Sequence, residues 1–283
     1  MKIYISIDIE GITGVVSPLQ CNPAGGTQKY RDAVSMMAQE LGWACHAIWE
    51  ADESAEIVVN DAHCRMENLD VFQLPESADI RLISGKPKLI AMMHGLDKSF
   101  DAAMLIGYHA KAGTRSAVLA HTFHHHITDV SINGQSLGEA EVNSLYASLV
   151  CNVPVILAAG DTTFVDAYHR QNPDAAVIAT KTGLGYAVAE CYSATTVEES
   201  YYRTVEKLFD NTTSWKSMKP TIASPFTLDI AVADPLAADI LETLPLFERL
   251  DGRGLRHVNS DFEQLYRALQ SAYSMLSYAD YQR

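Results

Sequence analysis

The sequence predicts an α/β fold in which a mainly parallel sheet is sandwiched by helices, with a smaller C-terminal α+β subdomain. In the first half of the chain, short apolar runs alternate with a helical pattern. Several of these runs are continuously apolar, which is typical of strands buried on both faces of a parallel sheet. After about residue 220 the pattern changes, and Pro220 and Pro225 mark the junction.

The first half contains the clearest elements. Residues 2–8 alternate polar and apolar side chains and predict a strand that ends at Asp8. Apolar residues at three- and four-residue steps predict a helix from Tyr30 to about Asp52. A short helix is expected around Leu89–Leu96. The further buried strands of this half are EIVVND (56–61), RLISG (81–85) and AAMLIGYHA (102–110).

The second half continues the alternation and then departs from it. Residues 129–134 predict a strand and turn, and an amphipathic helix is expected over 195–209 with Thr195 as its candidate N-cap. The other elements expected are a helix within 136–150, strands at 154–161, 176–182 and 226–234, a short helix at 236–244 and a helix at 259–279. We therefore divide the chain into a catalytic domain (1–220) and a C-terminal subdomain (221–283), with one integrated domain as the alternative.

Composition excludes several classes of function. The formal net charge is −14 over 283 residues, which argues against nucleic-acid binding and against adsorption to anionic lipid. No window approaches the ~18–20 consecutive apolar residues of a membrane span. Five scattered cysteines without a CxxC pair do not suggest a disulfide framework. The N-terminus lacks the apolar stretch of a signal peptide, so we expect a cytoplasmic protein without a membrane or nucleic-acid partner.

Acidic and imidazole side chains follow three of the predicted strands. Asp8 and Glu10 come after the first, His63 after the second (with Asp61 as a direct ligand or as an orienting residue), and His109 after the fourth. Ligands collect at the carboxyl ends of strands in open α/β sheets. Two carboxylates two residues apart on one face of a strand repel each other unless a cation lies between them. The pattern indicates a metal site.

Two later segments add candidates. The run from His121 to His126 reads HTFHHH, but in a strand its histidines would not share one face, so at most one or two can serve a common site. His121 is the best placed, because it directly follows an apolar run. Glu139 lies at the start of a predicted helix, where a carboxylate is also favoured by the helix dipole.

Two histidines and three carboxylates can hold two zinc ions with one carboxylate bridging, and manganese or cobalt are substitutes. Two such ions can share a water or hydroxide and polarise a carbonyl, which is hydrolase chemistry. The sequence has no GxSxG, HExxH, Walker or dinucleotide-binding motif.

Five blocks in order resemble the zinc-dependent D-aminopeptidase family of the dipeptide-transport-associated DppA type: MKIYISIDIEGITGV, VVNDAH, LIGYHAKAGT, LAHTF and INGQSLGEAEVN. The resemblance implies a binuclear zinc aminopeptidase that releases N-terminal residues, often D-amino acids, from short peptides. It implies Asp8 as the bridging ligand, Glu10, His63, His109 and Glu139 as the other ligands, and a catalytic His121. On physical grounds we expect a metal-bound hydroxide to be the nucleophile. We expect His121 to act as an acid/base or to stabilise an oxyanion rather than as a covalent nucleophile.

The resemblance further implies ring-shaped homo-oligomers, stacked into a decamer with a central channel that admits short peptides. The sequence departs from the family pattern at Tyr186, which stands where a basic residue is expected. The alternatives are another metal-dependent amidase or L-aminopeptidase on the same scaffold, a non-catalytic metal-containing binding protein and, more remotely, a phosphoryl-transfer enzyme. The last would need more positive charge near these motifs.

Overall fold

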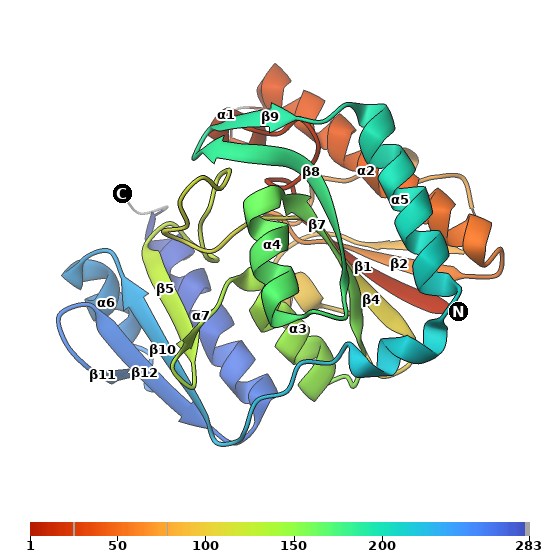
Figure 1. The fold of residues 1–283 in the computed structure, drawn as a ribbon. Helices are drawn as coiled ribbons and strands as arrows, with labels where there is room; N and C mark the ends of the chain where they lie inside the picture. The colour runs from red at the N-terminus through yellow and green to blue at the C-terminus, as the bar shows by residue number, and fades with distance from the viewer. Residues whose placement is uncertain (25, 78, 281–283) are drawn as a thin grey trace.

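The centre of the molecule is a seven-stranded sheet with helices on both faces (Figure 1). The computed structural model describes residues 1–24, 26–77 and 79–280. In spatial order the strands are β3 (Ile80–Ile83), β2 (Glu56–Asp61), β1 (Lys2–Ile7), β4 (Ala102–Tyr108), β7 (Val155–Asp161), β8 (Ala176–Gly185) and β9 (Val188–Cys191). Neighbours run parallel except β9, which is antiparallel to β8. The predicted mainly parallel α/β sheet is confirmed.

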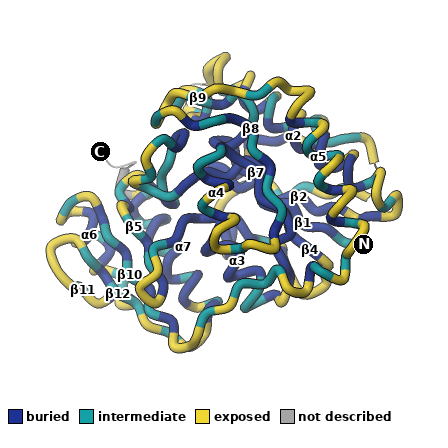
Figure 2. Tube along the Cα trace, in the orientation of Figure 1, coloured by how far each residue is buried: buried dark blue, intermediate teal, exposed yellow. Residues whose placement is uncertain are grey.

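Side chains on alternate positions of β1 enter two different cores. Ile3 and Ile5 pack with helices α2 (Gln28–Ala51) and α5 (Ala194–Phe209) on one face. Tyr4 packs on the other face, in a core shared with α3 (Glu139–Leu149) and α4 (Thr162–Gln171). Figure 2 shows the resulting buried centre of the molecule, with exposed segments mainly at its edges. Because both faces are covered, the central strands are continuously apolar.

The second sheet is antiparallel and combines strands from two parts of the chain. Its order is β11 (Glu248–Arg249), β12 (Gly254–Asn259), β10 (Phe226–Val232), β5 (Ile127–Ile132) and β6 (Gln135–Ser136). Helices α6 (Pro235–Glu242) and α7 (Phe262–Asp280) pack on it, and α7 also contacts α3. The predicted C-terminal α+β unit is therefore present, but its sheet also takes β5 and β6 from the first half. The division of the chain at residue 220 stays a prediction. The last residues of the predicted subdomain, 281–283, lie outside the part of the chain that the structure describes.

Some elements differ from the sequence expectations. A short helix that was not predicted, α1 (Pro18–Cys21), follows β1, and the expected helix at 89–96 is only the 3₁₀ turn η2 (Ala91–Met93). The other 3₁₀ turns are η1 (Val71–Gln73) and η3 (Thr212–Ser217). Helix α4 was not predicted, because β7 leads directly into it and Asp161, the last residue of the strand, is its N-cap. Thr195 is not the N-cap of α5; Ser193 is, since its hydroxyl accepts a hydrogen bond from the Thr196 N–H.

The strand order reverses beside β1. From β1 the chain proceeds to β2 and β3 on one side and then returns to place β4 on the other side. The connections after β1 and β4 therefore leave in opposite directions, and such a switch point opens a crevice at the carboxyl ends of the strands. No helix in the described ranges is both long enough and apolar enough to cross a bilayer.

Candidate metal centre

Asp8 and Glu10 lie just beyond the end of β1, and both carboxylates face one imidazole. The Nδ1 atom of His63 is 3.1 Å from Asp8 Oδ1 and 3.2 Å from Glu10 Oε2. We expected the two acids to share one face of a strand. The strand instead ends at Ile7 and the chain then bends, and this bend brings the two carboxylates together. All three side chains are buried.

A main-chain hydrogen bond on the side away from the two carboxylates orients the ring of His63. Its Nε2–H donates a hydrogen bond to the carbonyl oxygen of Cys21, at 2.6 Å, which leaves Nδ1 directed at the two carboxylates. The carboxylate of Asp61 accepts hydrogen bonds from the main-chain N–H groups of Asn68 and Leu69 and so shapes the loop that carries His63. Asp61 therefore acts on the site through this loop.

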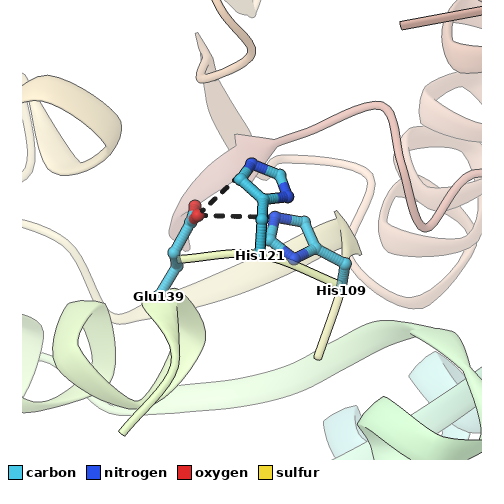
Figure 3. Close-up of side chains that lie close together, drawn as sticks. All are labelled: His109, His121 and Glu139. Atoms are coloured by element: carbon cyan, nitrogen blue, oxygen red, sulfur yellow. Dashed lines mark ion pairs between the residues drawn. The ribbon is translucent and has the colours of Figure 1, made fainter. Parts of the chain in front are cut away.

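A second group forms on the other side of Asp8. His109 follows β4 and donates Nδ1–H to the carbonyl oxygen of Ala110, so its Nε2 is directed inward. This Nε2 is 3.6 Å from Asp8 Oδ2 and 3.5 Å from Glu139 Oε1. Glu139 is the first residue of α3, and its Oε1 also lies 3.7 Å from Nε2 of His121. In Figure 3 the Glu139 carboxylate faces both imidazoles. The imidazole rings of His109 and His121 stack with centroids 4.0 Å apart.

The segment around His121 is not a strand but an irregular loop held from several sides. Glu139 Oε1 accepts a hydrogen bond from the Phe123 N–H, and His121 donates Nδ1–H to the carbonyl oxygen of Leu119. The Leu119 N–H donates to the carbonyl oxygen of Tyr186, so the β8–β9 hairpin supports this loop through its main chain. The rings of the three neighbouring histidines, His124 to His126, pack against one another, and those of His124 and His126 are stacked.

Two glycines allow the main chains of β1 and β4 to approach closely beside the site. A Cβ atom on Gly11 would lie 2.0 Å from the carbonyl oxygen of Tyr108. Gly107 has a φ of +71°, and a Cβ there would lie 2.2 Å from the carbonyl oxygen of Asp8. Any larger residue at either position would move the ligand-bearing segments apart.

The segment after Glu10 is organised by a buried lysine of β8. Lys181 is fully buried, and its ammonium donates hydrogen bonds to the carbonyl oxygens of Glu10 (2.7 Å), Ile12 (2.8 Å) and Val15 (2.6 Å). Lys181 and Cys21 were not predicted as site residues. Their contacts come from distant segments, and no local pattern indicates them.

The pKa values of Asp8, Glu10 and His63 are shifted because two carboxylates lie close together in a buried site. Burial and the neighbouring Glu10 carboxylate raise the pKa of Asp8 to about 6. Burial also acts to raise the pKa of Glu10, but the adjoining His63 outweighs it and holds this pKa well below its usual range. Although burial opposes protonation of His63, the Glu10 and Asp8 carboxylates hold the pKa of its imidazole well above the usual range. The site therefore draws a positive charge to the space between these groups.

The two stacked imidazoles differ in their electrostatic environment. Burial and the adjacent His121 lower the pKa of His109, which favours a neutral ring able to bind a metal. For His121, burial acts in the same direction, but the Glu139 and Glu10 carboxylates outweigh it and raise the pKa. Environments that push two pKa values apart are typical of sites that separate binding from proton transfer.

The donor set fits divalent metal ions. In the described part of the chain, the buried Oε2 of Glu10 and Nε2 of His109 have no hydrogen-bond partner, although burying such atoms unpaired is costly. The candidate ligand atoms form two groups, each within 4.8 Å: Asp8, Glu10 and His63; and His109, His121 and Glu139. The two oxygens of Asp8 face one group each. Imidazole nitrogens with carboxylate oxygens are a zinc donor set.

All of the sequence-predicted site residues therefore meet at one place. Five of them, Asp8, Glu10, His63, His121 and Glu139, line a pocket of about 760 Å³ together with side chains of α7 such as Tyr273. No sequence pattern indicates that α7 contributes, because its part in the pocket depends on how it packs beside α3 and the loop of Phe123.

Comparisons with known proteins agree with this geometry. A family model described as D-aminopeptidase (peptidase family M55) matches residues 1–271. A curated D-aminopeptidase from Bacillus subtilis (strain 168) is 34% identical over 195 residues, which is 68% of each chain. A solved structure, the zinc-dependent D-aminopeptidase DppA from Bacillus subtilis, described as a self-compartmentalizing protease, superposes with a TM-score of 0.89 at 26% identity over 97% of each chain. This chain belongs to the D-aminopeptidase family of peptidases.

Proposed function

We propose that this protein is a zinc aminopeptidase that holds two zinc ions per subunit and releases N-terminal D-amino acids from short peptides. One observation carries the proposal: the two oxygens of a single buried carboxylate, Asp8, face His63 on one side and His109 on the other. Glu10 completes the first group and Glu139 the second. Asp8 would accordingly be the residue shared by the two ions.

Zinc ions in such a site would activate water and polarise the carbonyl of the scissile bond. The chain supplies the other components. His121 has the position and the raised pKa of a group that takes and returns a proton at Nε2, while its Nδ1–H stays bonded to Leu119. His121 is the more accessible of the two stacked imidazoles, since its side chain is 31% exposed and that of His109 1%. We therefore assign proton transfer to His121 and metal binding to His109.

Three finer parts of the proposal rest on the family. The preference for D-residues and the use of zinc, rather than manganese or cobalt, follow the relatives from Bacillus subtilis. A homo-oligomer is proposed with support from the self-compartmentalizing relative, and its form as a ring-based decamer is proposed from the family resemblance. A cytoplasmic location is supported by five cysteines that are all unpaired.

The test combines metal analysis with an activity assay on matched peptides. The purified protein is expected to contain two zinc ions per subunit, to cleave D-alanyl peptides faster than L-alanyl peptides, and to lose activity to a chelator. Faster cleavage of the L-peptides would favour an L-aminopeptidase or another amidase on this scaffold. Bound zinc without cleavage of either series would favour a metal-containing binding protein.

A further inference from the structure

The pocket beside the metal centre contains an ammonium group for which the proposed chemistry so far has no use. Three carboxylates lie at the centre of the site: Asp8, Glu10 and Glu139. Lys86 lines the same pocket. Its Nζ has one weak polar contact, at 3.5 Å from the carbonyl oxygen of Cys64. Within the described ranges, no carboxylate forms an ion pair with Lys86.

Two neighbours place this ammonium close to the metal centre. Cys64 directly follows the ligand His63 in the chain. The Nζ atom of Lys86 also lies 5.9 Å from the ring centroid of Tyr273. That ring stacks on Phe123, whose N–H donates to Glu139. One residue, Cys64, therefore connects Lys86 with the first group of ligands, and two residues, Tyr273 and Phe123, connect it with the second.

The main chain around Lys86 is fastened to the loop that carries His63. The Gly85 N–H and the Ser84 hydroxyl both donate hydrogen bonds to the carbonyl oxygen of Met66. On the other side, the buried ammonium of Lys88 donates to the carbonyl oxygen of Asp61 at 2.6 Å. The position of Lys86 relative to His63 is therefore set by the fold, although its side chain remains exposed and adjustable.

We propose that Lys86 binds the C-terminal carboxylate of the substrate, so that short peptides with a free C-terminus are preferred over their C-terminal amides. This inference rests on the proposed aminopeptidase function. The carboxylate of a dipeptide lies one residue beyond the scissile bond, about 3.5 Å of extended chain, and that of a tripeptide about 7 Å. A carboxylate forms its strongest hydrogen bonds with a charged donor, and Lys86 is a lysine of the pocket lining without an anionic partner.

The test compares two peptides that share the scissile bond and differ in one charge: D-alanyl-D-alanine and its C-terminal amide. For the wild type we expect a higher kcat/KM on the free acid. In Lys86→Met the ratio of kcat/KM for acid over amide should fall about tenfold, mainly through KM, as for loss of one charge-assisted contact. Lys86→Glu should reverse the preference, and Lys86→Arg should retain most of it.

Two controls separate the explanations. Lys98→Met removes another exposed lysine, outside the pocket lining, and should leave the ratio unchanged. Zinc content should be the same in all variants, because Lys86 is not a candidate ligand. An equal loss on both peptides, or a loss of zinc, in Lys86→Met would overturn this proposal and assign Lys86 to positioning the His63 loop. A wild type that cleaves neither peptide would instead overturn the proposed function itself.

Discussion

Replacing the buried lysine of β8 tests whether the segment after Glu10 is held in place from the sheet. In Lys181→Met, the carbonyl oxygens of Glu10, Ile12 and Val15 lose their shared donor. Three hydrogen bonds from a charged donor contribute about 5–9 kcal/mol. The variant no longer buries an ammonium, which recovers several kcal/mol. We therefore expect the free energy of unfolding to fall by about 2–4 kcal/mol.

The same substitution should weaken metal binding, because Glu10 is a candidate ligand and its main chain is held by Lys181. Substitution of a residue that positions a metal ligand typically lowers metal affinity by about 10- to 100-fold. We expect a loss of that size in a zinc competition titration with a chromophoric chelator, alongside urea unfolding of the metal-free protein at one fixed protein concentration.

Lys207→Met is the matched control, since Lys207 is an exposed lysine of the neighbouring helix α5. It should change neither stability nor zinc affinity by a measurable amount. Unchanged zinc affinity in Lys181→Met, at whatever stability, would refute the idea that this ammonium positions Glu10.

Three further results are expected. His121→Ala should abolish peptide cleavage while both metal ions stay bound; a lost zinc ion in mass spectrometry would make His121 a ligand. Gly11→Ala should lower the free energy of unfolding by about 1–3 kcal/mol, because its Cβ would collide with the carbonyl oxygen of Tyr108; an unchanged melting temperature would contradict this close approach. The raised pKa of His63 means that the metal-free protein holds a proton there at pH 7, which zinc must displace, so zinc affinity should fall as the pH falls. Calorimetric enthalpies of zinc binding that did not differ between two buffers of different ionisation enthalpy would exclude this proton release.

Much of the site could be predicted because each candidate ligand directly follows an apolar strand or begins a helix. Asp8, His63 and His109 come within two residues of the ends of β1, β2 and β4, and parallel strands bring such ends to one edge. Glu139 starts α3. Periodicity and residue type are local properties, so the sequence alone was sufficient to identify these elements and the chemistry of their ends.

The remaining features depended on contacts between distant segments. The carbonyl oxygen of Cys21 selects the tautomer of His63, Lys181 reaches across from β8 to the segment after Glu10, and the pocket wall includes Tyr273 of α7. No periodic pattern of residues in the sequence indicates any of these contacts. Strands β5 and β6 likewise joined the C-terminal sheet across the predicted boundary.

The sequence by itself thus determined which residue types are available, and that they stand at the ends of buried strands. Only the tertiary structure decided that Asp8 presents one oxygen to each of two groups and that Lys86 lies within the pocket of the same site. The physical reason is that metal coordination depends on the positions of a few atoms to within fractions of an ångström. These positions are set by the packing of the whole chain, which local sequence patterns do not encode.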